Sequence, residues 1–347
     1  MREYLNNGHI SDIDIEIYDI SANKLHSLMN SINANSYGKS FFVYKYKDID
    51  IALARSEKQV SNHHNGFEVK IESSERKACV RRDFKMNSIM MNLFTYEILD
   101  IFNGINDIKN KTVSIINETR FKEDSLRVLR AVQFCARLGF RCDKYSINIM
   151  QNISIDNISN SRIFAELEKL FLASYLHIGW FYFVKLGIFK YIFKKNCPYG
   201  RFANTYKKLK TLNIKSNKEL YRFYFLYVIF EEFHFNKRKF FNKNNIFPNI
   251  YKKILIKQKY TPKNTTDKFL IALSLRYPLK DWLGCENKEI KKRAMKLDIY
   301  EKSFQPTISI DEIIKMGYKK EEIKIKFKEL AYKEIKQIRQ LANNDTD

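Results

Sequence analysis

The stretch Ser11–Ile17 reads SDIDIEI, and it decides the fold that we expect for this chain. Isoleucines alternate with acidic residues, and a period of two is typical of a strand with one buried face. Asp12 and Asp14 are separated by one residue, so their side chains point to the same side of such a strand. A carboxylate pair of this kind can hold Mg²⁺ beside a phosphate group. A solvated strand end is the alternative interpretation of this short motif.

The composition favours several domains with long helices. The chain has 347 residues, whereas single cores rarely grow past about 250–300 residues. A hydrophobic fraction of 45% excludes a disordered chain, and the 10 Gly and 5 Pro residues leave few helix breaks. The net charge of +23 favours a polyanionic partner, and charge alone leaves both nucleic acid and an anionic membrane open.

We expect neither a disulfide scaffold nor a membrane span. The five cysteines form no CxxC pair and are sparse for this length, which favours a reducing cytoplasm. The longest apolar run, around Phe223–Phe230, is far shorter than the ~18 residues that a span needs. The N-terminus carries no apolar signal-peptide segment. A cytoplasmic protein without membrane contact is therefore expected, and no protein partner is indicated.

The residues after the first strand predict a small mixed domain. The expected elements are a helix (Lys24–Asn33), three strands (Ser40–Lys47, Asp48–Arg55 and Phe67–Glu72) and a polar loop (Ser56–Gly66). Asp50, rather than Asp48, is the candidate for a further carboxylate at the site. The adjacent His63 and His64 cannot both face one metal from a regular element, so we expect them to contact nucleotide or solvent.

The segment Arg120–Arg141 predicts a helix with one polar side. The polar residues of that side recur every three positions: Asp124, Arg127, Arg130 and Gln133. An ion pair between Asp124 and Arg127 on a solvated face is one interpretation. The other is base selection, because cytosine and adenine both present an amino donor beside a ring-nitrogen acceptor. A carboxylate and a guanidinium complement these two groups.

Basic residues concentrate in the segment Lys190–Lys259. It holds 18 Lys and Arg residues against 3 Asp and Glu residues, so 15 of the 23 net positive charges lie there. A solvated lysine face is the alternative to a surface that neutralises RNA phosphates. The candidates for RNA contact are Lys207, Lys208 and Lys210.

Seven segments occur in an order that is typical of one enzyme family. They are REYLNN (Arg2–Asn7), DIDI (Asp12–Ile15), ALARSEKQVSNHHNGFEV (Ala52–Val69), RRDFKMN (Arg81–Asn87), DIFNGINDI (Asp100–Ile108), RFKEDSLRVLRA (Arg120–Ala131) and ISNSRIFAELEKL (Ile158–Leu170). Together they resemble the class II tRNA nucleotidyltransferase and poly(A) polymerase family. The resemblance covers residues 1–190 well, and Ile308–Leu330 is similar to the family's tail at a weaker level.

The resemblance implies an α+β protein. A small nucleotidyltransferase head of the polymerase-beta-like α/β type would span residues 1–112, followed by all-α neck, body and tail. The neck (113–190) would carry the base-templating helix, and the body and tail (191–347) would bind RNA. The family's strand and Gly-Gly pair ahead of REYLNN have no counterpart here, so we expect an N-terminally short head.

The resemblance also assigns residues to roles. Asp12 and Asp14 would bind Mg²⁺, and Asp50 would be the third catalytic carboxylate. The implied nucleotide-binding residues are Arg2, Arg82, Asp83, Asn87, Asp124, Arg127, Arg130 and Arg162. Among them, Asp83 and Asn87 would read the ribose, while Arg2 and Arg130 would contact the phosphates or the base.

The implied activity is template-independent addition of C and A to tRNA 3′ ends. CTP and ATP would be the substrates, the tRNA acceptor end the partner, and pyrophosphate the released product. By resemblance the loop Arg55–Gly66 supports A addition, which disfavours an enzyme that adds C alone. A poly(A) or A-adding polymerase and an inactive, shortened homologue that only binds tRNA are the alternatives.

Overall fold

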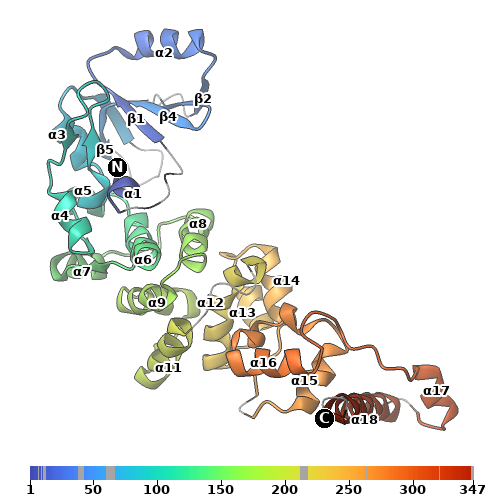
Figure 1. Ribbon diagram of the computed structural model, residues 1–347. Helices are drawn as coiled ribbons and strands as arrows, with labels where there is room; N and C mark the ends of the chain where they lie inside the picture. Colours follow the sequence, from blue (N-terminus) through green and yellow to red (C-terminus); the bar gives the residue numbers. More distant parts are fainter. Residues whose placement is uncertain are drawn as a thin grey trace. The chain divides into compact units, whose positions relative to one another are not determined.

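The chain forms two compact units, Met1–Tyr191 and Ile192–Asp347 (Figure 1). The computed structural model describes residues 1–6, 8, 10, 13–37, 43–59, 67–211, 218–262, 264–319 and 321–344. Strands occur in the first unit, and the described part of the second unit is helical. The expected α+β fold is therefore confirmed. The division into three regions at residues 112 and 190 stays a prediction.

The first unit begins with a mixed α/β part. Its elements are α1 (Arg2–Leu5), β1 (Ile13–Ile17), α2 (Ala22–Ser31), β2 (Asn35–Tyr37), β3 (Val43–Tyr46), β4 (Ile49–Leu53), β5 (Arg55–Gln59), β6 (Phe67–Ile71), α3 (Glu75–Val80), the 3₁₀ turn η2 (Lys85–Asn87), β7 (Met90–Met91), β8 (Ile98–Leu99), α4 (Gly104–Lys109) and β9 (Thr112–Val113). The helices that follow are α5 (Glu118–Lys122), α6 (Leu126–Leu138), α7 (Lys144–Gln151), α8 (Asn160–Phe171) and α9 (Leu176–Lys185), with β10 (Arg141–Cys142) after α6. Helix α10 (Ile188–Phe193) begins in the first unit and ends in the second.

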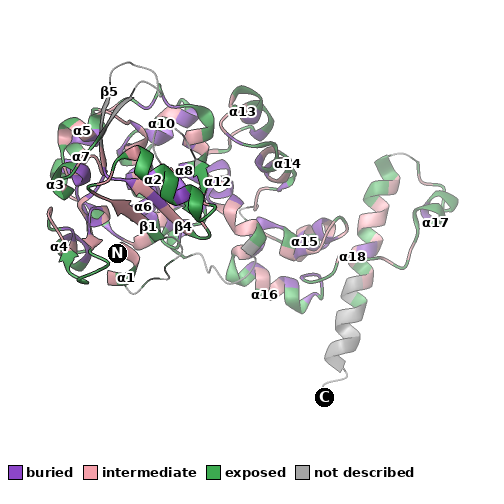
Figure 2. Ribbon diagram, turned by 90° about the horizontal axis from the view of Figure 1, so that it is seen from above, coloured by how far each residue is buried: buried purple, intermediate pink, exposed green. Residues whose placement is uncertain are grey.

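The central sheet of this unit has the strand order β1-β4-β3-β2. β1 and β4 are parallel, while β3 is antiparallel to both β4 and β2. Helix α2 covers one face, where Leu25 and Met29 pack with Leu53 and with the partly buried Ile15 and Ile17 (Figure 1). Exposed residues follow the outer side of α2 (Figure 2). Since side chains alternate along a strand, the acidic residues of β1 lie on the opposite face of the sheet.

The predicted loop after β4 is shorter than expected. Residues 55–59 form β5, which pairs with β6 in an antiparallel hairpin, so the expectation of a loop from Ser56 onward was wrong for its first four residues. Cross-strand pairing with β6, which the polar composition of this segment does not reveal, is the reason. His63 and His64 lie outside the described residues.

The predicted helix over Arg120–Arg141 is interrupted. The Asn117 side chain accepts a hydrogen bond from the backbone N–H of Arg120 and caps the short helix α5. A second helix, α6, starts only at Leu126, whose N–H donates to Oδ1 of Asp124 at 3.2 Å. Asp124 therefore precedes the helix that carries Arg127. Gln133, expected on the polar side, is buried because other helices of the unit cover α6 there.

Helices α6, α8 and α9 pack together as an apolar layer of the first unit. Gly179 on α9 allows the closest approach, since a β-carbon there would lie 2.3 Å from Leu170 on α8 and 2.9 Å from Ala136 on α6. Nearby, Trp180 is fully buried and packs on Phe189. This layer holds α6 in a fixed position, as tight interior packing requires.

Gly104 at the start of α4 fixes the turn that carries Asn87. A β-carbon at Gly104 would lie 2.2 Å from the carbonyl oxygen of Lys85 in η2, so only glycine fits. The Asp100 carboxylate accepts hydrogen bonds from the N–H groups of Gly104 and Ile105 at 2.6 and 2.9 Å. The DIFNGINDI segment thus supports η2 through its backbone.

The described part of the second unit consists of helices around two apolar cores, one of them rich in phenylalanine. They are α11 (Tyr199–Lys210), α12 (Lys218–Phe233), α13 (Lys237–Lys243), α14 (Asn249–Lys257), α15 (Asp267–Ser274), α16 (Lys288–Lys296), α17 (Ile310–Lys315) and α18 (Glu321–Asn344), with 3₁₀ turns η3 (Leu279–Asp281) and η4 (Leu283–Glu286). Phe230 packs against Phe240 and Phe241, and Trp282 anchors the other core. Among the described residues, no helix has the length and apolarity to cross a membrane.

Candidate active site

Two of the predicted carboxylates lie side by side on the open face of the sheet. Asp14 on β1 is in register with Asp50 on β4, and neighbouring parallel strands point such partners to the same side. Asp14 is exposed, and Asp50 is half-buried with its carboxylate 3.7 Å from Nζ of Lys45. Asp12 lies outside the described residues. The structure therefore brings Asp14 and Asp50 together, and the place of Asp12 stays a prediction.

The donor set of this face fits a divalent cation with hard oxygen ligands. Asp14 and Asp50 supply carboxylate oxygens, and their exposure leaves room for waters and phosphate oxygens, which Mg²⁺ prefers as its other ligands. Across the part of the chain that the structure describes, no three His, Cys, Asp or Glu side chains form a cluster of metal ligands. The described ligands of a metal site here would thus be Asp14 and Asp50, and the expected further ligands are Asp12 and the substrate.

Glu16 lies on the same face of β1 as Asp14, and the sequence analysis did not include it among the site residues. Its carboxylate accepts from Arg81 and from the Tyr18 hydroxyl, and it lies 3.1 Å from Nη2 of Arg82. Burial acts to raise the pKa of Glu16, but Arg82 and Arg81 outweigh it and hold this pKa below its ordinary value. The signal was available, because Glu16 follows Asp14 at the same spacing of two by which Asp14 follows Asp12.

Asp83 is a buried junction of the arginine network. Its carboxylate accepts hydrogen bonds from Nε of Arg130 at 2.6 Å, from Nδ2 of Asn87 at 2.7 Å and from the N–H of Phe84 at 2.8 Å. Burial acts to raise the pKa of Asp83, whereas Arg130 and Asn87 lower it, and the net pKa lies below the ordinary value. In this geometry Asp83 holds Arg130 and Asn87 in place.

Arg2 joins the same junction from the N-terminal segment. Its guanidinium donates to Oδ1 of Asn87 and pairs with Glu3, and it lies 4.6 Å from the ring centre of Phe134. Burial, together with the nearby charge of Arg137, lowers the pKa of Arg2 to about 10. Crowding of like charges in a half-buried space favours the binding of an anion there.

Asp124 and Arg127 do not pair with each other. Asp124 accepts two bonds from Nη2 of Arg162, at 3.1 and 3.2 Å. Arg127 instead donates to the backbone carbonyl groups of Arg120 and Arg81, at 2.6 and 2.5 Å. The interpretation of these two residues as a mutual surface ion pair was therefore wrong. The break between α5 and α6 is the reason, because it places Asp124 off the helix face of Arg127.

Glu166 on α8 is a further residue that the sequence reading missed. It is buried, accepts from Lys169 at 2.7 Å and lies 4.0 Å from Nη1 of Arg130. Its place in the segment ISNSRIFAELEKL, four positions after Arg162 on the same helix, was the available signal. Glu166 thus adds a second carboxylate near Arg130, whose Nε donates to Asp83.

The predicted RNA-binding lysines lie on one helix of the second unit. Lys207, Lys208 and Lys210 are exposed on α11, and Lys208 lies 3.2 Å from a carboxylate oxygen of Glu232. The basic segment does not face solvent throughout. Lys237 is buried, donates to the carbonyl of Gln258 at 2.7 Å, and has a pKa lowered to about 8 by burial.

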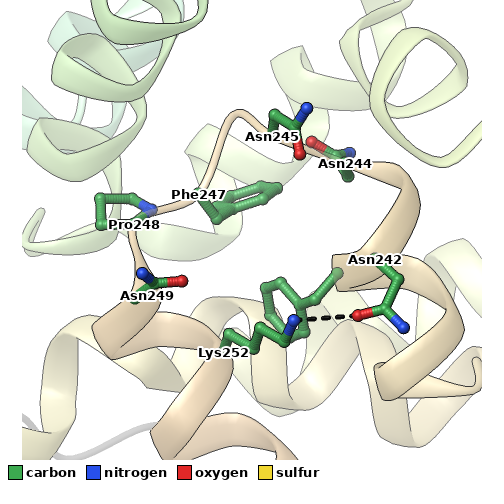
Figure 3. Close-up of a pocket in the computed structure, with 8 residues that line it drawn as sticks. Asn242, Asn244, Asn245, Phe247, Pro248, Asn249 and Lys252 are labelled. Carbon is green, nitrogen blue, oxygen red and sulfur yellow. Dashed lines mark hydrogen bonds between the residues drawn. The ribbon is translucent and has the colours of Figure 1, made fainter.

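The second unit also contains a polar hollow of about 420 Å³ between α13 and α14 (Figure 3). Asparagine side chains surround it, and Lys252 donates to Oδ1 of Asn242 at its edge. None of the predicted site residues lines this hollow. We therefore assign the candidate active site to the carboxylates and arginines of the first unit. The assignment is based on the chemistry of these side chains and not on the presence of a pocket.

Two family models match separate parts of the first 198 residues. One, described as the Poly A polymerase head domain, matches residues 1–114, and the other, described as a probable RNA and SrmB-binding site of polymerase A, matches residues 147–198. The CCA-adding enzyme of Staphylococcus epidermidis is 28% identical over 198 residues, covering 55% of this chain and 49% of that enzyme. The CCA-adding enzyme of Buchnera aphidicola is 32% identical over 163 residues, covering 44% and 38%.

Solved structures share the fold at low sequence identity. The crystal structure of the Bacillus stearothermophilus CCA-adding enzyme in complex with CTP matches with a TM-score of 0.61 at 19% identity, covering 99% of this chain and 87% of that chain. A tRNA nucleotidyltransferase complexed with a primer tRNA and an incoming ATP analog matches with a TM-score of 0.61 at 16% identity, covering 86% and 92%. At this identity the likeness concerns the fold alone.

The chain spans about half the length of the curated relatives that it matches. The match to residues 1–114 contains the strand of Asp14 and the RRDFKMN turn of the candidate site, and α6 lies between the two matched ranges. The motifs, the family models and the fold agree with one another: residues 1–114 belong to the poly(A) polymerase head-domain family, and the chain is similar to the class II CCA-adding enzymes and poly(A) polymerases.

Proposed function

We propose that this protein is a template-independent RNA nucleotidyltransferase that adds C and A to the 3′ end of tRNA. The observation that carries the proposal is a continuous run of contacts from the carboxylate strand to α6. It leads from Glu16 through Arg82 to Asn87, and from Asn87 through Asp83 to Arg130. Carboxylates for a metal and guanidinium groups for a nucleotide thus belong to one connected site.

In this proposal the carboxylate face positions the reacting groups. Asp14 and Asp50, with Asp12, would hold Mg²⁺, which lowers the pKa of the RNA 3′-hydroxyl and neutralises charge on the triphosphate. The excess of guanidinium groups around Asn87 suits the phosphates of CTP and ATP. Arg82 and Arg130 are already oriented by Glu16 and Asp83, so little side-chain order has to be gained on binding.

Base selection is assigned to the start of α6. Asp124 would accept from the amino group of cytosine or adenine, and Arg127 would donate to the neighbouring ring nitrogen. Arg127 uses two backbone carbonyl groups as supports, which hold it while other N–H donors of its guanidinium remain for the base. Arg162 neutralises Asp124 in the absence of nucleotide, and an incoming base would compete with it.

The tRNA is the proposed partner of the basic second unit. Lys207, Lys208 and Lys210 are exposed and can neutralise phosphates of the acceptor arm. These contacts would position the RNA without choosing the nucleotide.

The experiment is incorporation into tRNA that lacks its 3′ end. Purified protein is incubated with this tRNA, Mg²⁺, and CTP or ATP, separately and together, and the products are separated by length. We expect full extension only with both nucleotides. Asp50→Asn should abolish extension, whereas Asp48→Asn, which removes an exposed carboxylate two residues away, should extend tRNA at the wild-type rate.

The outcomes distinguish the alternatives. Extension with ATP alone, in long or short tracts, would favour a poly(A) or A-adding polymerase. Binding of tRNA without any extension would identify a homologue that only binds RNA. Extension by Asp50→Asn at the wild-type rate would remove Asp50 from the site.

A further inference from the structure

Glu16 makes more contacts with charged groups than the proposed reaction requires of it. Its side chain is only 9% exposed, and one carboxylate oxygen lies 2.5 Å from Nη2 of Arg81 and 3.1 Å from Nη2 of Arg82. The second oxygen accepts a hydrogen bond from the Tyr18 hydroxyl at 3.0 Å. Both oxygens are therefore engaged by protein donors, which makes Glu16 a poor metal ligand although it lies on the face of Asp14.

The two arginines that Glu16 holds lead to different parts of the site. Arg82 donates through Nη1 to the carbonyl of Asn87 at 2.9 Å, next to the junction at Asp83. Arg81 accepts through its own carbonyl oxygen a hydrogen bond from Nη2 of Arg127 at 2.5 Å. Glu16 thus contacts Arg82, which we assign to phosphate binding, and is separated only by Arg81 from Arg127, which we assign to base selection.

We infer that Glu16 is a positioning residue, which fixes the turn after α3 so that Arg82 faces the triphosphate and Arg127 faces the base. This inference rests on the proposed function and adds a residue to the same site. A charged carboxylate is required, because hydrogen bonds between ionised partners are about twice as strong as neutral ones and hold a guanidinium in one plane. Without that charge the Arg81 and Arg82 side chains gain alternative orientations.

A role in stability alone predicts a different result. In that case Glu16 neutralises two half-buried guanidinium groups, and its loss lowers the melting temperature without changing how a folded molecule binds nucleotide. The inferred positioning role changes nucleotide affinity and choice at temperatures where the variant is fully folded. Nucleotide binding measured below the melting transition therefore separates the two roles.

The test compares Glu16→Gln with a matched surface variant, Glu118→Gln. Glu118 likewise accepts from a cation and a tyrosine, Lys122 at 2.5 Å and Tyr145 at 2.9 Å, and it has no contact with the site. Isothermal titration calorimetry with CTP and with ATP in Mg²⁺ should show a Kd raised about tenfold in Glu16→Gln, equivalent to about 1.4 kcal/mol. Glu118→Gln should bind both nucleotides as the wild type does.

Nucleotide choice is the second readout. Because Arg127 is supported by the carbonyl of Arg81, Glu16→Gln should incorporate UTP and GTP at a larger share of the CTP and ATP rates than the wild type. Glu16→Asp keeps the charge on a shorter side chain, so its affinity should lie between those of the wild type and Glu16→Gln. It also serves as the variant to measure if Glu16→Gln does not fold.

The results separate this inference from the proposed function. Unchanged Kd values in folded Glu16→Gln, or in Glu16→Asp if that is the variant that folds, would overturn the positioning role while the wild type still extends tRNA. A wild type that binds CTP and ATP but extends no tRNA would overturn the proposed function, and the Kd comparison would still decide the role of Glu16. Equal losses of affinity in Glu16→Gln and Glu118→Gln would also refute it.

Discussion

Asp124→Ala separates base selection from structural support at the start of α6. The carboxylate has two structural roles in the folded chain, the pair with Arg162 and the hydrogen bond from the N–H of Leu126. The pair is partly exposed, at 28% and 36% for the two side chains, so its loss should cost about 0–1 kcal/mol. The hydrogen bond at the helix start adds about 1 kcal/mol.

These two contributions predict a modest loss of stability. A total of about 1–2 kcal/mol corresponds to a decrease of roughly 2–8 °C in the melting temperature of a unit of this size. Asp143→Ala is the matched control, because Asp143 caps α7 by accepting from the N–H of Ser146 at 2.7 Å. It should lower the melting temperature by a similar amount and leave nucleotide choice unchanged.

The effect on selectivity should be larger than the effect on stability. Without the Asp124 carboxylate, no group repels the carbonyl oxygen that uracil and guanine present at this position. Discrimination against UTP and GTP should then fall by ~1–3 kcal/mol, or roughly 5- to 150-fold. Arg127→Ala should instead slow CTP and ATP alike, since both correct bases use this donor.

The assay is single-turnover incorporation of each of the four nucleotides into tRNA. It compares the wild type with Asp124→Ala, Arg127→Ala, Arg162→Ala and Asp143→Ala. Arg162→Ala removes the ion pair and keeps the carboxylate, so discrimination should be retained. If the ratios of the four rates are the same in Asp124→Ala as in the wild type, Asp124 has only a structural role and the proposed base selection is refuted.

Four further predictions concern the metal, the RNA, the acid limb of stability and the packing of the site. Asp14→Asn should abolish incorporation but keep tRNA binding in a filter assay, and wild-type incorporation would exclude this metal site. Charge reversal of the three lysines on α11 (Lys207, Lys208 and Lys210) should weaken tRNA binding and reduce the magnitude of the slope of log K against log salt by about 2–3. Nucleotide choice should stay the same. An unchanged slope would contradict the predicted contact of these lysines with RNA. The pKa of Asp83 is lowered in the folded state, so its contribution to stability is fully present above about pH 4 and is lost as pH falls through the folded pKa. In urea unfolding, the free energy of unfolding of Asp83→Asn should therefore fall less steeply at acid pH than that of the wild type. An equally steep fall would contradict this prediction. Gly104→Ala should lower the free energy of unfolding by about 1–3 kcal/mol, because the added methyl group meets a backbone carbonyl, and an equally stable variant would show that η2 can move.

The local sequence pattern was sufficient to predict the strand that carries Asp14 and the neighbouring carboxylate, Asp50. The period of two in SDIDIEI predicted β1 and put Asp14 on an open face, since alternation depends only on backbone geometry. Asp50 followed from the next such strand, and the register with Asp14 confirms that the two are neighbours. The same alternation contained Glu16, whose importance was invisible until its partners from the RRDFKMN turn were known.

The sequence by itself determined which groups are available: the alternation that makes β1 a strand, the excess of basic residues after residue 190, and the order of motifs that indicates the family. Only the tertiary structure decided which group meets which. Asp124 bonds to Arg162 and not to Arg127, Lys237 lies inside its unit and not on the surface, and Glu16 holds two arginines at once. The physical reason is that strand and helix periods are local properties of the backbone, whereas the partner of a charged side chain is set by packing between segments distant in the sequence.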